Sequence, residues 1–240
     1  MKVKLLHPLI SCLCISSNRP ESLLKSIISF DQQNYPNKEL IVSYAKGDKE
    51  TKDLISNIVN TVDFEIIAIE HQENESVGLA RNNAARVCNG DYICMWDDDD
   101  IYYFTRIADQ YNLLQGEGRY YQSSMILQII LYDGVNKKAF LSFKNQWNGT
   151  LLCKTEHFLK YPCTDSNHYE CRPVIDYLLS KNLMLQTRLS PNLYTYVYHG
   201  LNVVDYFHFQ YYVKKSSPLS TEHAQSINTF LEQRVKVNIS

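Results

Sequence analysis

The first hundred residues alternate between short apolar runs and amphipathic segments, and this alternation restricts the fold more than any other feature of the chain. The apolar runs predict strands over residues 8–15, 39–44, 64–69 and 92–95. The segments between them predict helices that begin near residues 18–21, 51 and 77. A series of strand, helix and strand is typical of a mostly parallel open sheet flanked by helices. We therefore expect an α/β fold whose ligands bind at the carboxyl ends of the strands.

Four successive aspartates, residues 97–100, follow the last of these strands. Adjacent carboxylates repel one another, so a fold that gathers them at the end of a buried strand needs a cation or full solvation. If the segment stays extended, Asp97 and Asp99 point to one side and Asp98 and Asp100 to the other. Hard oxygen ligands select Mg²⁺, Mn²⁺ or Ca²⁺ over zinc. We predict that Asp97 and Asp99 bind one metal ion; the alternative is a solvated turn that caps the next helix.

Length and charge exclude several classes of function. The chain has 240 residues and a net charge of −2, so it can bury a sizeable core but lacks the basic excess that nucleic-acid binding needs. No apolar stretch approaches the ~20 residues that span a bilayer, and the start lacks an apolar run of signal-peptide length. The seven cysteines lie mostly in apolar runs, which predicts buried reduced thiols. We expect a cytoplasmic protein without a transmembrane segment, which leaves peripheral membrane contact open.

Five segments of the first half occur in a recognisable order. They are Asn18-Arg19-Pro20-Glu21, Glu39-Leu40-Ile41-Val42, Gly78-Leu79-Ala80-Arg81-Asn82, Gly90-Asp91-Tyr92-Ile93 and Asp97-Asp98-Asp99-Asp100. Together they resemble glycosyltransferase family 2, the GT-A nucleotide-sugar transferases, clearly over residues 8–110 and more weakly beyond. The resemblance implies a GT-A fold, a nucleotide-diphosphate sugar as donor, a Mg²⁺ or Mn²⁺ ion on the diphosphate, and usually inversion at the anomeric carbon.

The same resemblance suggests which residues form the donor site. Asp97 and Asp99 match the metal motif, and the positions expected along the nucleotide and its diphosphate are Ser16, Ser17, Arg81 and Asp98. The chemistry supports Arg81 independently, because a guanidinium near the leaving diphosphate stabilises the negative charge that develops there. The alternative for Arg81 is an arginine on the surface of a helix, and the two serines are alternatively plain turn residues.

The second strand departs from the family pattern. Relatives typically end it with aspartates that recognise the base and ribose, whereas this chain has Ser43-Tyr44-Ala45. We predict that Asp48, the nearest acid, substitutes for them or that Tyr44 stacks on the base. The alternative for Tyr44 is an aromatic ring that fills the core.

The catalytic base is expected at the start of a helix over residues 174–180. Relatives carry an acidic pair there, but this chain has Glu170-Cys171. A carboxylate is needed because a thiol in apolar surroundings stays protonated. We predict Glu170 as the base and Asp165, on the preceding loop, as the alternative. His199 lies in a segment that resembles relatives with a histidine near the metal, and we predict it as a third ligand; its alternative is a structural histidine.

The second half carries weaker signals. We expect a strand pair over residues 124–131 and 138–143 around a turn at 132–134, and a strand over 193–200. Trp147 either offers a stacking face to a sugar or fills the core. Residues 214–218 read as a linker before an amphipathic helix over 221–235, which packs on the domain or binds a partner.

The sequence therefore predicts one GT-A domain over residues 1–215, with a nucleotide-sugar half (8–110) and a smaller acceptor half (111–215), followed by a linker and helix (216–240). The predicted activity is the transfer of a sugar from a nucleotide diphosphate to a hydroxyl of a glycan, lipid-linked or other acceptor, as in polysaccharide biosynthesis. Two alternatives remain. One is an impaired scaffold that only binds nucleotide sugar or glycan, because Cys171 replaces an acid. The other is a nucleotidyltransferase, although the glycine-rich phosphate loop expected after the first strand is missing.

Overall fold

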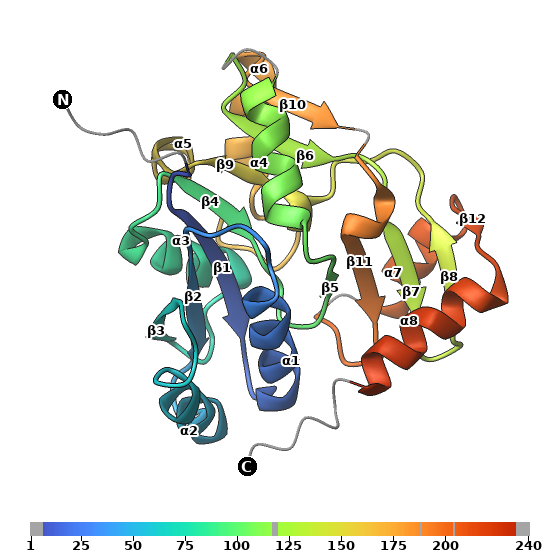
Figure 1. The fold of residues 1–240 in the computed structure, drawn as a ribbon, viewed down its shortest axis with the longest axis horizontal. Coiled ribbons are helices and arrows are strands. Elements are labelled where there is room, and N and C mark those ends of the chain that lie inside the picture. Colours follow the sequence, from blue (N-terminus) through green and yellow to red (C-terminus); the bar gives the residue numbers. More distant parts are fainter. Residues whose placement is uncertain (1–6, 117–119, 188, 204, 234–240) are drawn as a thin grey trace.

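A seven-stranded sheet forms the centre of the protein (Figure 1). The computed structural model describes residues 7–116, 120–187, 189–203 and 205–233. The strand order is β10-β6-β9-β4-β1-β2-β3. All neighbouring strands are parallel except β9, which runs antiparallel to both β4 and β6. The strands are β1 (Ile10–Ser16), β2 (Lys38–Ala45), β3 (Glu65–His71), β4 (Tyr92–Met95), β6 (Ser123–Ile126), β9 (Leu152–Lys154) and β10 (Met184–Thr187).

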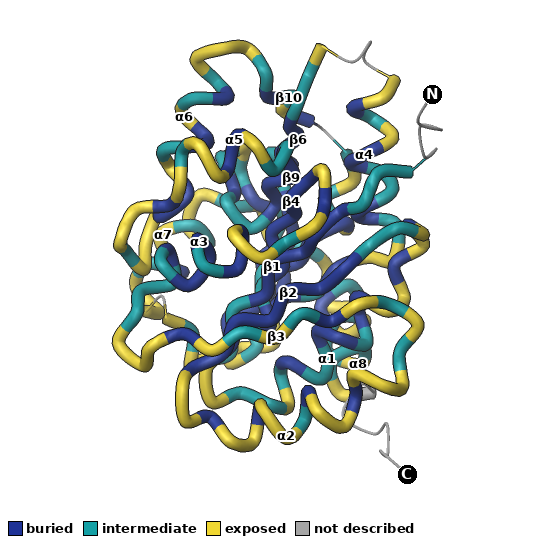
Figure 2. The backbone as a smooth tube through the Cα atoms, turned by 90° about the vertical axis from the view of Figure 1, so that its left-hand side faces the viewer, coloured by how far each residue is buried: buried dark blue, intermediate teal, exposed yellow. Residues whose placement is uncertain are grey.

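Helices cover both faces of this sheet, as the alternation in the sequence predicts. Side chains of β1 alternate between two buried clusters, with Cys12 and Cys14 on one face and Leu13 on the other. The first face is covered by α1 (Pro20–Asp31), α2 (Lys49–Ile58) and α4 (Arg106–Gly116), and the second by α3 (Val77–Val87), α5 (Thr155–Lys160) and α6 (Arg172–Ser180). Figure 2 shows the buried strands between these two layers. The expected α/β class is confirmed, and all seven cysteines are free, six of them buried.

A second sheet stands beside the first, on the right in Figure 1. Its order is β12-β8-β7-β11-β5. Its strands are β5 (Ile101–Tyr102), β7 (Ile130–Asp133), β8 (Lys138–Leu141), β11 (Tyr194–Tyr198) and β12 (Ser217–Pro218). Two helices accompany the second sheet, α7 (Tyr206–Val213) and α8 (Thr221–Gln233). Elsewhere in the chain, short 3₁₀ turns cover Asn148–Thr150, beside the main sheet, and Pro191–Leu193, before β11. None of the helices in the described ranges is both long and apolar enough to cross a membrane.

The expected strand over residues 124–131 is wrong, because two strands in different sheets occupy this segment. The backbone N–H of Leu127 donates to Thr187 in the main sheet, whereas that of Ile129 donates to Ser142 Oγ beside the second sheet. The chain therefore changes sheets between β6 and β7. The hairpin turn also lies later than expected, since Asp133 ends β7 and its Oδ1 accepts the backbone N–H groups of Val135 and Asn136.

The last part of the chain belongs to the second sheet. The expected linker contains β12, which pairs with β8. On α8, Ala224 is buried against the second sheet, and Ile227 and Leu231 pack around it. Of the two roles left open for this helix, the structure therefore shows packing on the domain. The expected end of the helix at residue 235 lies outside the described residues.

Candidate active site

A cavity of about 410 Å³ opens at the carboxyl ends of the parallel strands. The strand register brings these ends to one edge, because Ser16 pairs with Tyr44 and Ala45 with His71. The main-sheet side of the cavity contributes Ser16, Ser17, Arg19, Arg81 and Asp97 to Asp100, and the other side contributes Trp147, Tyr169, Glu170, Tyr196, His208 and Tyr212. The cavity thus lies where the sequence predicts a ligand site, between the two sheets.

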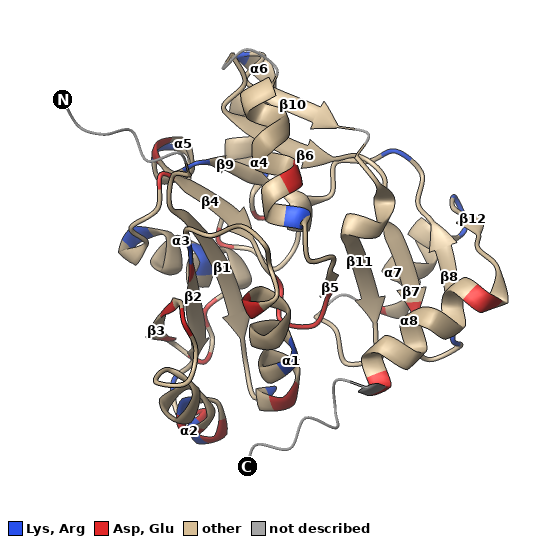
Figure 3. Cartoon of the chain, in the orientation of Figure 1, with Lys and Arg blue, Asp and Glu red and all other residues tan. Residues whose placement is uncertain are grey.

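The four aspartates form a turn after β4. The prediction that their side chains alternate between two sides assumed an extended segment instead. The acidic stretch crosses from β4 to β5 in Figure 3. Asp97 and Asp99 are nevertheless partly exposed, whereas Asp98 and Asp100 are buried. Tyr194 donates its hydroxyl to Asp100, whose other oxygen accepts the Val197 N–H at 2.9 Å. Asp100 therefore ties the turn to β11.

Arg19 compensates part of this negative charge. Its Nη2 lies 2.7 Å from Asp98 Oδ1, and its Nη1 lies 2.8 Å from Asp99 Oδ2. Burial, reinforced by the charge of Asp99, raises the pKa of Asp98 to about 8. Burial also acts to raise the pKa of Asp99, but the hydrogen bond with His199 and the charge of Arg19 outweigh it and lower that pKa.

Asp97 and Asp99 retain free ligand atoms. Asp97 uses Oδ1 to pair with Arg81, and Asp99 uses Oδ2 to pair with Arg19 and His199. Their remaining oxygens, Asp97 Oδ2 and Asp99 Oδ1, have no hydrogen-bond or ion-pair partner among the described residues. Within the same part of the chain, no three His, Cys, Asp or Glu side chains converge on one point. A dication here would take these two carboxylates and complete its shell with substrate oxygens and water, which is the usual arrangement for Mg²⁺.

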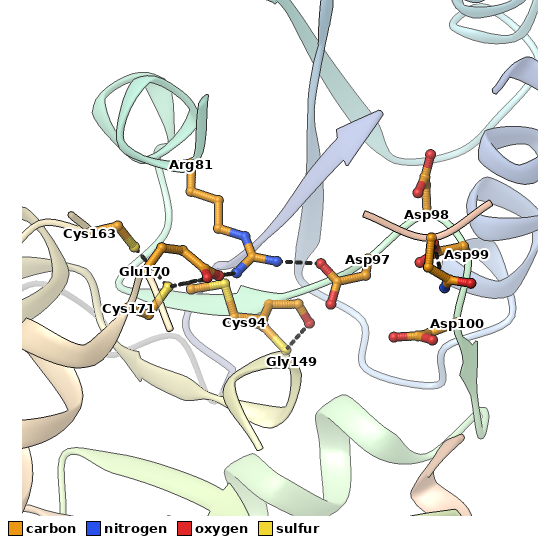
Figure 4. A network of polar contacts seen from close by, with 12 residues as sticks. Arg81, Cys94, Asp97, Asp98, Asp99, Asp100, Gly149, Cys163, Glu170 and Cys171 are labelled. Carbon is orange, nitrogen blue, oxygen red and sulfur yellow. Dashed lines mark hydrogen bonds and ion pairs between the residues drawn. The ribbon is translucent and has the colours of Figure 1, made fainter. Parts of the chain in front are cut away.

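Arg81 lies between two carboxylates (Figure 4). It projects from α3 and is 5% exposed, which excludes the surface-helix alternative. Its Nη2 lies 2.5 Å from Asp97 Oδ1, and its Nη1 pairs with Glu170 Oε1. Burial acts to lower the pKa of Arg81, but the charges of Asp97 and Glu170 outweigh it and raise that pKa well above its ordinary value. The guanidinium thus connects the metal-site candidate to the base candidate, two residues far apart in the sequence.

The loop over residues 163–171, which carries Glu170, is fixed to the start of α3. A Cβ on Gly78 would lie 1.9 Å from the backbone oxygen of Thr164, so only glycine permits this approach. The side chain of Asn82 exchanges two 2.8 Å hydrogen bonds with the backbone of Cys163. The sequence motif contained both residues, but neither received a role there, because their partners lie more than 80 residues away.

Cys171 does not take the place of the missing acid. It is fully buried behind Glu170, and its Sγ lies 2.7 Å from Cys163 Sγ. Burial, reinforced by the contact with Cys163, raises the pKa of Cys171 well above the ordinary value. Glu170 lines the cavity, whereas Asp165 is exposed and is absent from its walls. The structure therefore places the preferred base candidate at the cavity and the alternative outside it.

Two predicted donor residues also lie away from the cavity. Tyr44 is 6% exposed in the core, where its hydroxyl donates to Glu70 at 3.2 Å. Asp48 caps α2 by accepting the Thr51 N–H at 3.0 Å, and its second oxygen accepts the Asn18 N–H at 2.6 Å. Both expectations are corrected, because the Tyr44 ring is buried in the core and both oxygens of Asp48 accept backbone N–H groups.

The remaining predicted residues divide between two cavities. Ser16 and Ser17 line the main one, Ser16 from a fully buried position. His199 lines a smaller cavity of about 250 Å³ on the far side of the acidic turn, and its Nε2 lies 3.1 Å from Asp99 Oδ2. His199 therefore contacts Asp99, a predicted metal ligand, but does not line the main cavity as a third ligand would. Trp147 is 8% exposed and packs near Phe143, so it is chiefly a core residue at the cavity edge.

The model of glycosyl transferase family 2 matches residues 11–163. An Escherichia coli protein, the UDP-Glc:alpha-D-GlcNAc-diphosphoundecaprenol beta-1,3-glucosyltransferase WfaP, is 28% identical over 116 residues, which are 48% of this chain and 45% of the relative. An uncharacterized glycosyltransferase of Methanocaldococcus jannaschii is 29% identical over 109 residues, 45% of this chain and 38% of the relative. The aligned parts thus span less than half of each curated relative.

Solved structures agree with this assignment at the level of the fold. S. aureus TarS 1-349 in complex with UDP-GlcNAc has a TM-score of 0.64 and 12% identity over 96% of this chain and 76% of that one. The mannosyltransferase PcManGT from Pyrobaculum calidifontis, in complex with GDP-Man and Mn2+, has a TM-score of 0.63 and 12% identity over 92% of this chain and 70% of that one. Because the family model matches more than half of the chain, the protein belongs to glycosyl transferase family 2, and it has a GT-A-like fold.

Proposed function

We propose that the protein is a cytoplasmic, metal-dependent transferase that moves a sugar from a nucleoside diphosphate to an acceptor hydroxyl with inversion. The observation that carries this proposal is the cavity itself, in which Asp97, Asp99 and Glu170 are lining residues. The names of the relatives support the donor class: WfaP is described as using UDP-Glc, TarS binds UDP-GlcNAc, and PcManGT binds GDP-Man with Mn2+. Family membership removes the support for a nucleotidyltransferase.

Each residue of the chain has a distinct part in the proposed reaction. Asp97 and Asp99 would hold a Mg²⁺ or Mn²⁺ ion, which neutralises charge on the diphosphate when it is bound. Ser16 and Ser17 line the donor side of the cavity. Glu170 accepts the proton of the acceptor hydroxyl while that oxygen attacks the anomeric carbon and the diphosphate leaves from the opposite face. Arg81 orients Glu170 and stabilises its ionised form through their ion pair.

Calorimetry tests the donor half of the proposal. We expect UDP or GDP to bind in Mn²⁺ and to lose most of that affinity in a chelator. The Asp99→Asn variant should lose the effect of the metal, because it removes a negative ligand. Equal nucleotide affinity with and without chelator would contradict the metal assignment.

Transfer assays test the base. With a panel of sugar nucleotides and acceptors, Glu170→Gln should bind the donor normally and lose roughly 10²–10⁴-fold in transfer rate. Asp165→Asn is the matched control, since this acid lies outside the cavity and should leave the rate unchanged. Full activity of Glu170→Gln would refute its role. A wild-type protein that binds the donor yet transfers to no acceptor would support the alternative of a binding scaffold.

A further inference from the structure

We propose that Tyr169 and the aromatic wall around it form the acceptor site and that the acceptor group bound there is a pyranose ring. This inference rests on the proposed transferase function and specifies the class of its acceptor. The aromatic wall consists of Trp147, His168, Tyr169, His208 and Tyr212, all of which line the main cavity. The acidic turn and the two arginines of the donor side line the same cavity.

The rings of the aromatic wall contact one another in a defined arrangement. The rings of His208 and Tyr212 meet edge to face at 4.9 Å, and those of Tyr169 and His208 do so at 6.1 Å. His208 Nε2 lies 3.0 Å from the Tyr212 hydroxyl, and the two tyrosine hydroxyls lie 3.5 Å apart. Four of the five rings come from the 163–171 loop and from α7, and Trp147 directly precedes the 3₁₀ turn Asn148–Thr150, so the wall is assembled from segments distant in the sequence.

Tyr169 is held in an unfavourable conformation. Its φ is +52°, in the left-handed region that bulky side chains rarely adopt. The residue is also 56% exposed, so packing in the core does not explain the conformation. The surrounding loop enforces it: the Arg172 N–H donates to the Tyr169 carbonyl at 3.0 Å, and the Thr164 N–H donates to Glu170 at 2.8 Å. Strain that the surrounding structure maintains is characteristic of ligand-binding positions.

The chemistry of the wall favours a sugar over a lipid chain. A pyranose has an apolar face of C–H groups and an edge of hydroxyls, so it suits aromatic faces that alternate with hydroxyl and imidazole groups. An alkyl chain would instead cover the imidazoles of His168 and His208 and the hydroxyl of Tyr212 without offering them any hydrogen bond beyond the one that His208 and Tyr212 already share. Tyr169 and Glu170 are adjacent and both line the main cavity, so a sugar ring bound to Tyr169 has its hydroxyls in the neighbourhood of the proposed base.

Saturation-transfer NMR with methyl pyranosides tests the inference directly. The probes are the methyl glycosides of glucose, galactose, mannose and N-acetylglucosamine in both anomeric forms, added to the full chain with Mn²⁺ and UDP. At least one should bind and receive saturation on its ring C–H protons. Tyr169→Asn should weaken that binding roughly three- to tenfold, since asparagine tolerates a positive φ but removes the ring.

Two further variants separate the ring from the fold. Tyr169→Phe keeps the aromatic face and should retain binding within about twofold. Tyr120→Asn removes a tyrosine of similar exposure, 59%, that does not line the cavity, and should change nothing. Melting temperatures of the Tyr169 variants should equal or exceed that of the wild type, which excludes unfolding as the cause of lost binding.

Three results would overturn the inference. If UDP binds in Mn²⁺ but no pyranoside does, the acceptor class is wrong while the proposed function stands. If pyranosides bind equally to the wild type and Tyr169→Asn, Tyr169 is not the site. If phosphatidylglycerol vesicles rather than pyranosides bind and Tyr169→Asn abolishes that binding, the aromatic wall contacts lipid. Failure to bind any nucleotide in Mn²⁺ would instead count against the proposed function.

Discussion

Replacing Arg81 by methionine would leave Asp97 and Glu170 without their shared cation. Removing one partner from a buried ion pair costs about 3–5 kcal/mol, because the remaining charge stays in a poorly solvated position. The side chain of Glu170 is 8% exposed and that of Asp97 is 25% exposed, so water recovers part of the loss only at Asp97. We therefore expect a loss near the lower end, about 3 kcal/mol, a large fraction of the ~5–15 kcal/mol that stabilises a typical domain.

Urea denaturation measures this loss. With a slope near 3 kcal/mol per molar urea, the midpoint should fall by about 1 M. The urea midpoint of Arg81→Lys should lie between those of the wild type and Arg81→Met, because an ammonium retains the charge but lacks the fork that contacts both carboxylates. Adding Glu170→Gln to Arg81→Met should restore part of the stability, since it removes one of the unpaired charges.

The same variant reports on the metal. Without its guanidinium partner, Asp97 has both oxygens available, so Mn²⁺ should stabilise Arg81→Met more than it stabilises the wild type. An Arg81→Met midpoint within the error of the wild type would refute the ion-pair reasoning. An equal response of both proteins to Mn²⁺ would count against Asp97 as a ligand.

Gly78→Ala should destabilise the protein by about 1–3 kcal/mol in thermal unfolding, because its Cβ would collide with the Thr164 carbonyl. Gly116→Ala is the control and should leave the stability unchanged, because a Cβ there meets nothing within 4 Å. An unchanged melting temperature for Gly78→Ala would contradict the fixed loop. Asp48→Ala should cost about 1 kcal/mol as a lost helix cap yet leave UDP affinity unchanged, and a large loss of UDP affinity would restore Asp48 to the donor site.

The sequence predicted the first half of the fold well because each signal there is local. Strands β1 to β4 follow their apolar runs within a few residues, and proline begins α1 as expected. The position of the acidic turn followed from the same argument, since carboxyl ends of parallel strands meet at one edge. The burial of the four aspartates still alternates, with Asp97 and Asp99 partly exposed and Asp98 and Asp100 buried, although the segment is not extended.

Long-range contacts account for what the sequence did not predict. The partner of Arg81, Glu170, lies 89 residues away, and no local pattern joins them. The polar end of β2 suggested a donor contact at Tyr44, but Glu70 on the neighbouring strand satisfies its hydroxyl. The sequence analysis did not predict helix α7, because this segment is rich in aromatic residues and lacks a clear apolar stripe. The signal that could have indicated the helix is Asp205, whose side chain accepts the His208 N–H as a helix cap.

The distribution of charge suggests why donor binding should depend on a metal at all. Asp97, Asp99 and Glu170 line the cavity together, and the guanidiniums of Arg19 and Arg81 already pair with carboxylates of the site. A diphosphate is itself anionic, so in the absence of a cation it would meet an acidic wall whose two arginines are engaged. A dication bound between Asp97 and Asp99, as proposed, would reverse that balance, because it would supply positive charge where the two free carboxylate oxygens lie. We therefore expect the acidic turn to oppose nucleotide binding without metal and to support it with metal, so the affinity lost in a chelator should exceed what one lost ligand contact would cause.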